Sequence, residues 1–426
     1  MGTDMPPTLP TIAEPAAPRV VRSRGLGQAD ALVLDGAIHS SLAIVRNLAA
    51  HGVRVAVGAE SRLACAAASR HCREFVHHPR IDVAPEAAAR ALADYARRSP
   101  NVMVMPNTER THRFLYRWRQ LIEEAGACIA LPPEESFHSV NDKGETLRRA
   151  LRLGVPIPES YFPESFDDLM TIAGKVRYPV VVKARTSVDA TDRHLRPTAR
   201  VAYARSASDL RLLCSRLKPD APMPVVQEFV HGEGVGVFLL CDRGVPLLRF
   251  AHRRVRDVVP TGSASALRES VEYPTDLGAE AERLAADVAW TGPMMVEFRV
   301  DRESGRHYLM EINGRFWGSL QLAIDAGQEF PYAYYQMTRG RPVLAASEYA
   351  VGIRSYWLMG DIQHLFRVMR GRPAGFPGEY PSRRRALLEL LTPSRVPTRH
   401  EVLRWSDPKP FLFECASYLL RTVQRH

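Results

Sequence analysis

Short apolar runs alternate with amphipathic segments through the first third of the chain. The apolar runs predict strands at residues 31–34, 53–57, 102–105 and 128–131. The segments between them predict helices at residues 41–51, 86–98 and 113–125. Strands that alternate with helices through short connections are typical of a parallel sheet covered on both faces. The sequence therefore predicts an open α/β sheet in this part of the chain.

In an open α/β sheet, ligands usually bind where the strands end. The loop after the first strand holds one glycine, Gly36, where a dinucleotide fingerprint has three, so a dinucleotide site is not expected. His39, Ser40 and Asn107 lie on loops at this edge. These three residues either contact a substrate or act as turn and capping residues, which is the commoner role of such side chains.

Beyond residue 178 the pattern becomes that of antiparallel strands. Before this change, residues 139–153 predict a helix that Gly154 and Pro156 end. Strands are predicted at residues 179–184, 225–230, 235–241, 245–251, 294–301 and 307–313, and helices at residues 280–289, 356–369 and 411–423. The Asp-Arg-Gly segment at residues 242–244 predicts a hairpin turn.

Composition narrows the possible classes of protein. The chain of 426 residues carries 57 Lys and Arg against 47 Asp and Glu, a net charge of +10 that suits an anionic substrate, membrane surface or nucleic acid. Basic and aromatic residues are not interleaved as in nucleic-acid binders, so no nucleic-acid partner is expected. The six cysteines form no C-x-x-C pair and predict reduced thiols.

Residues 1–28 are rich in Pro, Ala and Arg and lack a continuous apolar core. They predict a disordered tail rather than a signal peptide. No later stretch offers the ~20 apolar residues that a transmembrane helix needs. A cytoplasmic protein is therefore expected.

The strongest chemical signal lies in the two strands at residues 294–301 and 307–313. Glu311 and Asn313 are two residues apart and therefore point to one face of their strand. A turn at residues 303–305 would place Glu297 directly opposite Glu311, with Cβ atoms ~5 Å apart. Two carboxylates and an amide oxygen suit Mg²⁺, although a surface hairpin with solvated acids is the alternative.

Two further strands end in polar groups. Residues 180–182 are valines that lead into Lys183, which predicts an ammonium delivered to an interior anion, unless its side chain reaches out from an edge strand. Residues 225–234 form a strand followed by a loop with glycines and carboxylates. The backbone at such a strand end can bind an adenine edge, and a nearby carboxylate can accept ribose hydroxyls.

In this order, the segments resemble the ATP-grasp superfamily, particularly its carboxylate–amine ligases, from about residue 31 to residue 342. The resemblance is most specific in the block Glu297…Glu311-x-Asn313-x-Arg315. It implies an ATP-grasp fold, of mixed α/β and α+β class, preceded by a Rossmann-like pre-ATP-grasp domain. It also implies an enzyme that uses ATP and Mg²⁺, with Mn²⁺ as a substitute.

The resemblance assigns each role in nucleotide binding and phosphoryl transfer to residues of this sequence. They are Glu297, Glu311 and Asn313 for the metal, Lys143 and Lys183 for the phosphates, the Glu228 and Val230 backbone for adenine, Glu233 for ribose, and Arg315 for an acyl phosphate. One stretch departs from the family pattern, because residues 186–200 should hold a glycine-rich phosphate loop and contain no glycine. Thr186, Ser187, Arg193 and Arg196 are the phosphate-binding groups it offers instead.

The resemblance also implies that residues 252–270 line the substrate side of the phosphates. Arg268 follows a loop of Gly, Ser and Ala and is expected to clamp a substrate carboxylate with both arms of its guanidinium. For Arg253 and Arg254, a solvated basic face is as good an interpretation as a functional one.

The chain is expected to divide into five parts: a tail at residues 1–28, a pre-ATP-grasp domain at 29–135, two ATP-grasp subdomains at 136–224 and 225–345, and a helical extension at 346–426. The apolar stripe of residues 356–369 is typical of core or homodimer packing, with peripheral membrane contact as a lesser alternative.

The leading functional hypothesis is amide-bond formation from a small-molecule carboxylate and an amine, through an acyl phosphate. The alternatives are phosphorylation of bicarbonate, as in carboxylases and carbamoyl-phosphate synthases, and a nucleotide-binding protein without catalysis.

Overall fold

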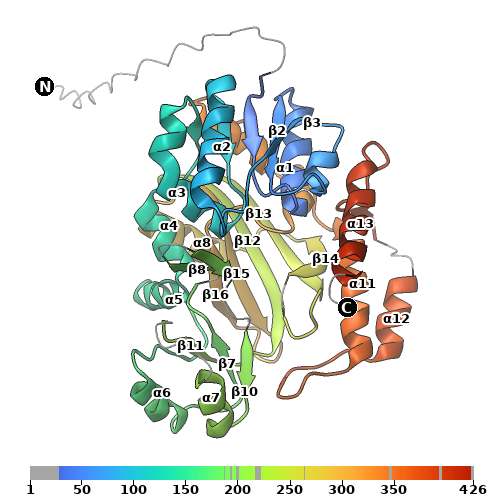
Figure 1. The fold of residues 1–426 in the computed structure, drawn as a ribbon. Coiled ribbons are helices and arrows are strands. Elements are labelled where there is room, and N and C mark those ends of the chain that lie inside the picture. Colours follow the sequence, from blue (N-terminus) through green and yellow to red (C-terminus); the bar gives the residue numbers. More distant parts are fainter. Residues whose placement is uncertain are drawn as a thin grey trace, which may run out of the picture.

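The computed structural model describes residues 28–186, 188–191, 194–197, 201–215, 222–262, 264–344, 348–392 and 396–423. It has four visible parts (Figure 1): an N-terminal α/β unit, a small sheet with its helices, a long central sheet, and a group of C-terminal helices beside the central sheet. The predicted tail lies almost entirely outside the described residues.

The N-terminal unit is built on a parallel sheet of order β3-β2-β1-β4-β5. Its elements are β1 (Ala31–Val33), α1 (His39–Ala50), β2 (Val55–Ala59), η1 (Cys65–Ala68), β3 (Cys72–His77), α2 (Pro85–Arg98), β4 (Met103–Met105), α3 (Glu109–Glu124) and β5 (Cys128–Ile129). Alternate residues of β1 pack on opposite sides, Val33 in a cluster with α1 and Leu32 in a cluster with α2 and α3. The predicted sheet covered on both faces is confirmed.

A small antiparallel sheet follows, with order β10-β7-β11-β6. This part contains α4 (Glu134–Asn141), α5 (Lys143–Arg152), β6 (Ser160–Tyr161), α6 (Phe166–Ala173), β7 (Val180–Lys183), β8 (Val188–Thr191), β9 (His194–Pro197), β10 (Ala202–Ala204), α7 (Ala207–Cys214) and β11 (Val225–Glu228). Strand β11 pairs with both β7 and β6, so the small subdomain runs through Glu228 and its boundary lies beyond the predicted residue 224.

The single helix predicted at residues 139–153 is two helices, α4 and α5. The break is at Asp142, whose extended backbone ends α4 and whose side chain accepts a hydrogen bond from the Glu145 N–H at 3.0 Å to cap α5. An Asp is a favourable N-cap, so it starts a new helix where the apolar periodicity alone continues the old one. Gly154, with φ of +68°, follows α5 as predicted.

The central sheet has the order β16-β15-β12-β13-β14-β17-β18. Its strands and the helices around them are β12 (Gly232–Asp242), β13 (Val245–Asp257), β14 (Ser265–Ser270), α8 (Thr275–Asp287), β15 (Gly292–Asp301), β16 (His307–Asn313), α9 (Leu320–Asp325), α10 (Phe330–Thr338), β17 (Arg354–Tyr356), α11 (Leu358–Arg370), α12 (Arg383–Leu391), β18 (Thr398–His400) and α13 (Lys409–Val423). Arg243 and Gly244 both have positive φ and form the predicted hairpin turn between β12 and β13.

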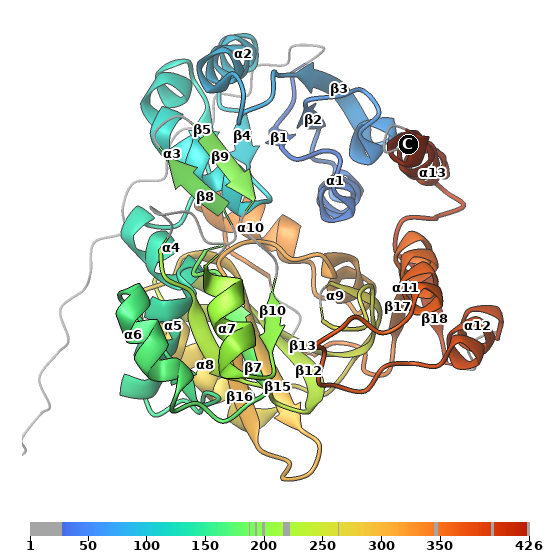
Figure 2. The ribbon, with the colours of Figure 1, turned by 60° about the horizontal axis from the view of Figure 1, so that its bottom comes forward.

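The C-terminal segment is more than the helical extension expected from the sequence. Strands β17 and β18 add to the edge of the central sheet beside β14. Its last helix, α13, lies beside η1 of the N-terminal unit (Figure 2). The C-terminal segment therefore contacts the N-terminal unit, although the two are far apart in the sequence.

Candidate active site

A cavity of about 350 Å³ lies where the small sheet meets the central sheet. Among the described residues, six Lys and Arg side chains line it against three Glu side chains. Apolar side chains, Val181, Tyr203, Phe229 and Val230, cover its other side. A surface of this kind fits a ligand with a flat apolar part and several negative charges.

The two acids predicted to bind a metal lie side by side on adjacent strands in the wall of the cavity. In the β15–β16 ladder Glu297 pairs directly with Glu311. The register shifts after this pair, so that Phe298 lies opposite Leu309 and Met310 is the extra residue of a bulge. In a regular strand Met310 would face away from Glu311 and into the core, but the bulge turns it to the cavity, which it lines.

Each acid also has a cationic partner. Glu311 Oε2 lies 3.1 Å from Lys143 Nζ, and Glu297 Oε2 accepts a hydrogen bond from Arg254 Nη2 at 2.5 Å. Burial opposes ionisation of Glu311, but the charges of Lys143 and Lys183 outweigh it and hold its pKa well below the ordinary value. Burial raises the pKa of Glu297, and Arg254 only partly offsets this.

The two predicted phosphate-binding lysines come from different elements, and both place a positive charge near Glu311. Lys143 begins α5, and Lys183 ends β7, where its Nζ donates to Gln227 Oε1 at 2.8 Å. Burial, opposed by the charge of Glu311 and assisted by that of Lys143, lowers the pKa of Lys183 to about 8. An anionic ligand beside both ammonium groups would relieve this repulsion.

Arg315 and Asn313 continue the same edge of the cavity. Asn313 Nδ2 donates to Glu311 Oε1 at 3.1 Å, and its Oδ1 accepts from Arg315 Nη2 at 3.0 Å. Arg315 Nη1 donates to the Phe316 carbonyl at 2.9 Å. These contacts hold the guanidinium beside the acid pair, where the sequence predicted it.

The predicted adenine contact lies at the end of β11. Glu228 and Val230 line the cavity. The Glu228 N–H donates to the Glu159 carbonyl at 2.8 Å, whereas the Val230 N–H makes no hydrogen bond with the described residues. Glu233 lies apart from these two, because it is an exposed residue of β12 and does not line the cavity. The structure therefore separates the ribose carboxylate of the prediction from the hinge.

Arg268 occupies a different environment from the one predicted. It lies within strand β14, not after a loop, and its side chain is 1% exposed. The guanidinium borders the cavity, but Nη2 donates to the Glu401 carboxylate and Nη1 to the Ser265 carbonyl. We therefore correct the expected role, because a fork already engaged by Glu401 is not available to clamp a substrate carboxylate.

Two arginines that the sequence left open or missed also belong to the site. Arg254 is buried against Glu297, whereas Arg253 is more exposed and lies 3.5 Å from Glu269. Arg299 lines the cavity as well, and the sequence analysis did not single it out. Its position two residues after Glu297 on the same strand is the signal that could have found it.

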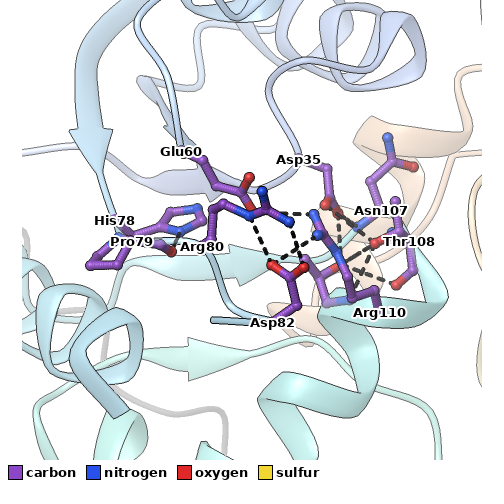
Figure 3. A network of polar contacts seen from close by, with 10 residues as sticks. Asp35, Glu60, His78, Pro79, Arg80, Asp82, Asn107, Thr108 and Arg110 are labelled. Atoms are coloured by element: carbon purple, nitrogen blue, oxygen red, sulfur yellow. Dashed lines mark hydrogen bonds and ion pairs between the residues drawn. The ribbon is translucent and has the colours of Figure 1, made fainter. Parts of the chain in front are cut away.

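The polar side chains in the loops at the edge of the N-terminal sheet bond mainly to one another (Figure 3). Asn107 Nδ2 donates to the hydroxyls of Ser40 and Ser41 at 2.8 Å. The Asn107 N–H donates to Asp35, as Figure 3 shows. The neighbouring Arg110 pairs with Glu60 and Asp82. Ser40 and Asn107 thus bond to each other within these loops, while neither caps a helix, because α1 has no side-chain cap and Thr108 caps α3.

His39 differs from the other residues of these loops because it lines the cavity. Its Nε2 lies 3.7 Å from Glu401 Oε1, and its ring centroid lies 4.7 Å from that of Trp357. The side chains of residues 187–200, including the glycine-free phosphate loop, lie outside the described part of the structure.

The residues present fit a hard divalent cation. Glu297 and Glu311 are directly opposed, and Asn313 adds an amide next to Glu311. The side chains that pair with the two acids, Lys143 and Arg254, come from other elements. Carboxylate and amide oxygens are the ligands that Mg²⁺ prefers. The described residues contain no group of three or more His, Cys, Asp or Glu suited to a metal, so Asn313 is needed to complete the set.

Comparison with known proteins agrees with this geometry. A family model described as "ATP-grasp in the biosynthetic pathway with Ter operon" matches residues 220–360, which include the acid pair and the end of β11. The structure is similar to the biotin carboxylase domain dimer of Hydrogenobacter thermophilus 2-oxoglutarate carboxylase, solved with MgADP, ADP and bicarbonate. The TM-score is 0.59 at 13% identity, over 77% of this chain and 73% of that one. These comparisons show that this chain has the ATP-grasp fold.

Other ATP-grasp proteins show the same likeness. N5-carboxyaminoimidazole synthetase from Staphylococcus aureus is similar with a TM-score of 0.56 at 12% identity, over 76% of this chain and 81% of that one. Pyruvate carboxylase from Aspergillus terreus is 26% identical over 212 residues, which are 46% of this chain and 17% of the carboxylase. This chain therefore spans only a small part of that relative. The predicted ATP-grasp fold is confirmed, and the relatives are ligases and carboxylases.

Within the described residues, no helix combines the length and the apolar character that crossing a membrane requires.

Proposed function

We propose that this protein is an ATP-dependent ligase that phosphorylates a small-molecule carboxylate and transfers the acyl group to an amine. The observation that carries the proposal is the pairing of Glu297 with Glu311 at the wall of a cavity that also receives Lys143, Lys183 and Arg315. Phosphoryl transfer needs these groups, because its transition state spreads negative charge over the phosphate oxygens.

The reaction has two steps. A carboxylate oxygen attacks the γ-phosphorus, the bond to the β,γ-bridging oxygen breaks, and ADP leaves. The amine nitrogen then attacks the acyl carbon, phosphate leaves and a proton is lost. Lys143 and Lys183 would neutralise phosphate charge, and Arg315 would hold the acyl phosphate. Glu297, Glu311 and Asn313 would hold Mg²⁺, which would supply Lewis-acid stabilisation of the phosphate charge, and Mn²⁺ is expected to substitute for it.

The test is phosphate release over a panel of carboxylic acids with hydroxylamine as a general trap. A true acid substrate should stimulate phosphate release and yield a hydroxamate in equal amount. The Glu311→Gln variant should yield neither product. Phosphate release without hydroxamate from any organic acid would contradict the proposal.

Phosphorylation of bicarbonate is the second candidate. It is favoured by the Hydrogenobacter thermophilus neighbour, which was solved with bicarbonate, and by the likeness to pyruvate carboxylase. In the same assay, bicarbonate would then stimulate phosphate release when every organic acid fails. A non-catalytic nucleotide-binding protein would bind ATP and release no phosphate under any of these conditions.

A further inference from the structure

A second cavity, of about 360 Å³, lies between the N-terminal unit and the C-terminal segment. It is bordered by two N-terminal loops and by the C-terminal segment, in particular by Ile38, Leu63, Trp357, Glu414, Ser417 and Tyr418. Helix α13 lies against this part of the N-terminal unit, as Figure 2 shows, and Ser417 Oγ donates to the Leu63 carbonyl at 3.3 Å. The C-terminal segment therefore builds a wall of the cavity.

The second cavity adjoins the candidate active site through one side chain. His39 lines both cavities. The His39 ring is held between Trp357, at 4.7 Å between ring centroids, and Glu401, at 3.7 Å. A molecule in the second cavity would thus lie next to the cavity that holds the phosphate-binding groups.

The two cavities differ in charge. Six Lys and Arg side chains line the first, whereas none of the described residues that line the second is a Lys or Arg. Most of its lining is apolar, with Glu414 as the one carboxylate. A carboxylate substrate would find its electrostatic partners in the first cavity, and a cationic or neutral group with an apolar body would find them in the second.

Glu414 provides a hydrogen-bond acceptor in this apolar setting. Its residue is 8% exposed, and Oε1 accepts a hydrogen bond from Trp357 Nε1 at 2.9 Å. Oε2 is buried and has no hydrogen-bond partner within the described residues. Burial raises the pKa of Glu414 to about 7, and the nearby Glu401 adds to this effect. A buried carboxyl group in this state gains most from a ligand that brings a positive charge.

We propose that the second cavity binds the acceptor substrate as a primary amine carried on an apolar body, with its ammonium group at Glu414 and its body against Trp357 and Tyr418. This assignment rests on the proposed ligase function. It gives the C-terminal segment a role in substrate binding, because Glu414, Ser417 and Tyr418 all belong to α13.

Direct binding to the full chain tests the proposal without requiring turnover. Isothermal titration calorimetry would compare 2-phenylethylamine with 2-phenylethanol and 3-phenylpropanoate, which share its ring but replace the ammonium group. The amine should bind most tightly. Glu414→Gln keeps an acceptor for Trp357 but removes the charge, so the Kd for the amine should rise at least tenfold. Ser417→Trp should block the cavity and have the same effect.

Leu412→Trp is the matched control, because Leu412 lies on α13, is 62% exposed and does not line the cavity. This variant should bind the amine like the wild type, and ATP affinity should be unchanged in all three variants. The proposal is overturned if the amine does not bind, if 3-phenylpropanoate binds more tightly, or if neither cavity variant weakens amine binding. The hydroxylamine assay does not depend on this cavity, since hydroxylamine has no apolar body. A failure here is therefore distinct from a failure of the ligase function.

Discussion

Glu311 is the residue on which most contacts of the candidate active site converge. Lys143 pairs with one of its oxygens, Asn313 donates to the other, and Lys183 adds a second positive charge nearby. Its pKa is therefore low, and the carboxylate stays ionised over the whole range of pH in which the protein is expected to work. An ionised oxygen ligand with two lysines beside it suits a site where Mg²⁺ and phosphate charges meet.

Replacing Glu311 by Gln should abolish ATP turnover and leave the fold intact. Glutamine keeps the size of the side chain and its bond to Asn313, but it loses the charge that a metal requires. Turnover should fall at least a hundredfold, measured as phosphate release with the true acid. Glu303→Gln, an exposed acid in the loop after β15, is the control and should behave like the wild type. Full activity of Glu311→Gln would refute the assignment of the metal site.

Lys183 provides a second prediction at this scale. Its ammonium group would meet phosphate charge both in bound ATP and in the transition state. Lys183→Ala should therefore raise the KM for ATP and also lower kcat, with a loss in kcat/KM of ten- to a hundredfold, which corresponds to ~1.5–3 kcal/mol for a charge-assisted hydrogen bond. Lys175→Ala, at an exposed position, should change neither constant. A change in KM alone would limit Lys183 to binding.

The sequence predicted which side chains of the β15–β16 hairpin share a face better than it predicted the contacts around them. The two-residue period of a strand placed Glu297, Glu311 and Asn313 on one face, and the ladder confirms it. The same period failed for Met310, because a bulge adds a residue that no local pattern announces. The partner of Arg268 was also unpredictable, since Glu401 lies 133 residues later in the chain.

At the scale of elements, strands with a regular apolar period were predictable, and strands whose apolar pattern is interrupted by charged residues were not. The strand at residues 307–313 has the predicted bounds, because alternating apolar residues meet a turn at each end. Strands β3 and β14 were missed, since polar residues such as Arg73 and Glu74 in β3 and Arg268 and Glu269 in β14 break the apolar pattern. Their pairing with neighbouring strands, which depends on the whole fold, makes them strands.

The end of β11 leads to a prediction about nucleotide choice. The Val230 N–H is free to donate to N1 of adenine, and the Glu228 carbonyl is expected to accept from the adenine amino group. Guanine reverses both groups, with a donor at N1 and an oxygen at position 6. The ratio of kcat/KM for ATP to that for GTP should therefore be at least tenfold, since two mismatched hydrogen bonds cost ~1 kcal/mol or more each. Equal use of both nucleotides would exclude this contact.

At the scale of the whole molecule, one buried acid, Asp407, makes several of the bonds between the C-terminal segment and the N-terminal unit. Asp407 accepts hydrogen bonds from Arg46 Nε at 3.0 Å, from Ser69 Oγ at 2.6 Å and from the Arg70 N–H at 3.0 Å. The Asp407 side chain is 2% exposed. Burial opposes its ionisation, but these donors outweigh burial and lower its pKa below the ordinary value. The same two parts of the chain also form the walls of the second cavity.

Asp407→Asn should loosen this attachment and lower the stability of the protein. The variant keeps an acceptor but loses the charge opposite Arg46 and places an amide N–H₂ among donors, which should cost ~1.5–3 kcal/mol in the free energy of unfolding at pH 7. Because the pKa is lowered in the folded state, the contribution of Asp407 is fully present above the unfolded value of ~3.9 and is lost as the pH falls below it. The difference between wild type and variant, measured from urea unfolding curves, should therefore start to shrink as the pH falls to ~4 and should continue to shrink until the pH has passed the lowered folded pKa. Asp94→Asn is the comparison, because Asp94 and Arg97 form an exposed ion pair worth ~0–1 kcal/mol. If the two variants were equally stable at pH 7, Asp407 would not be the attachment point that its contacts indicate.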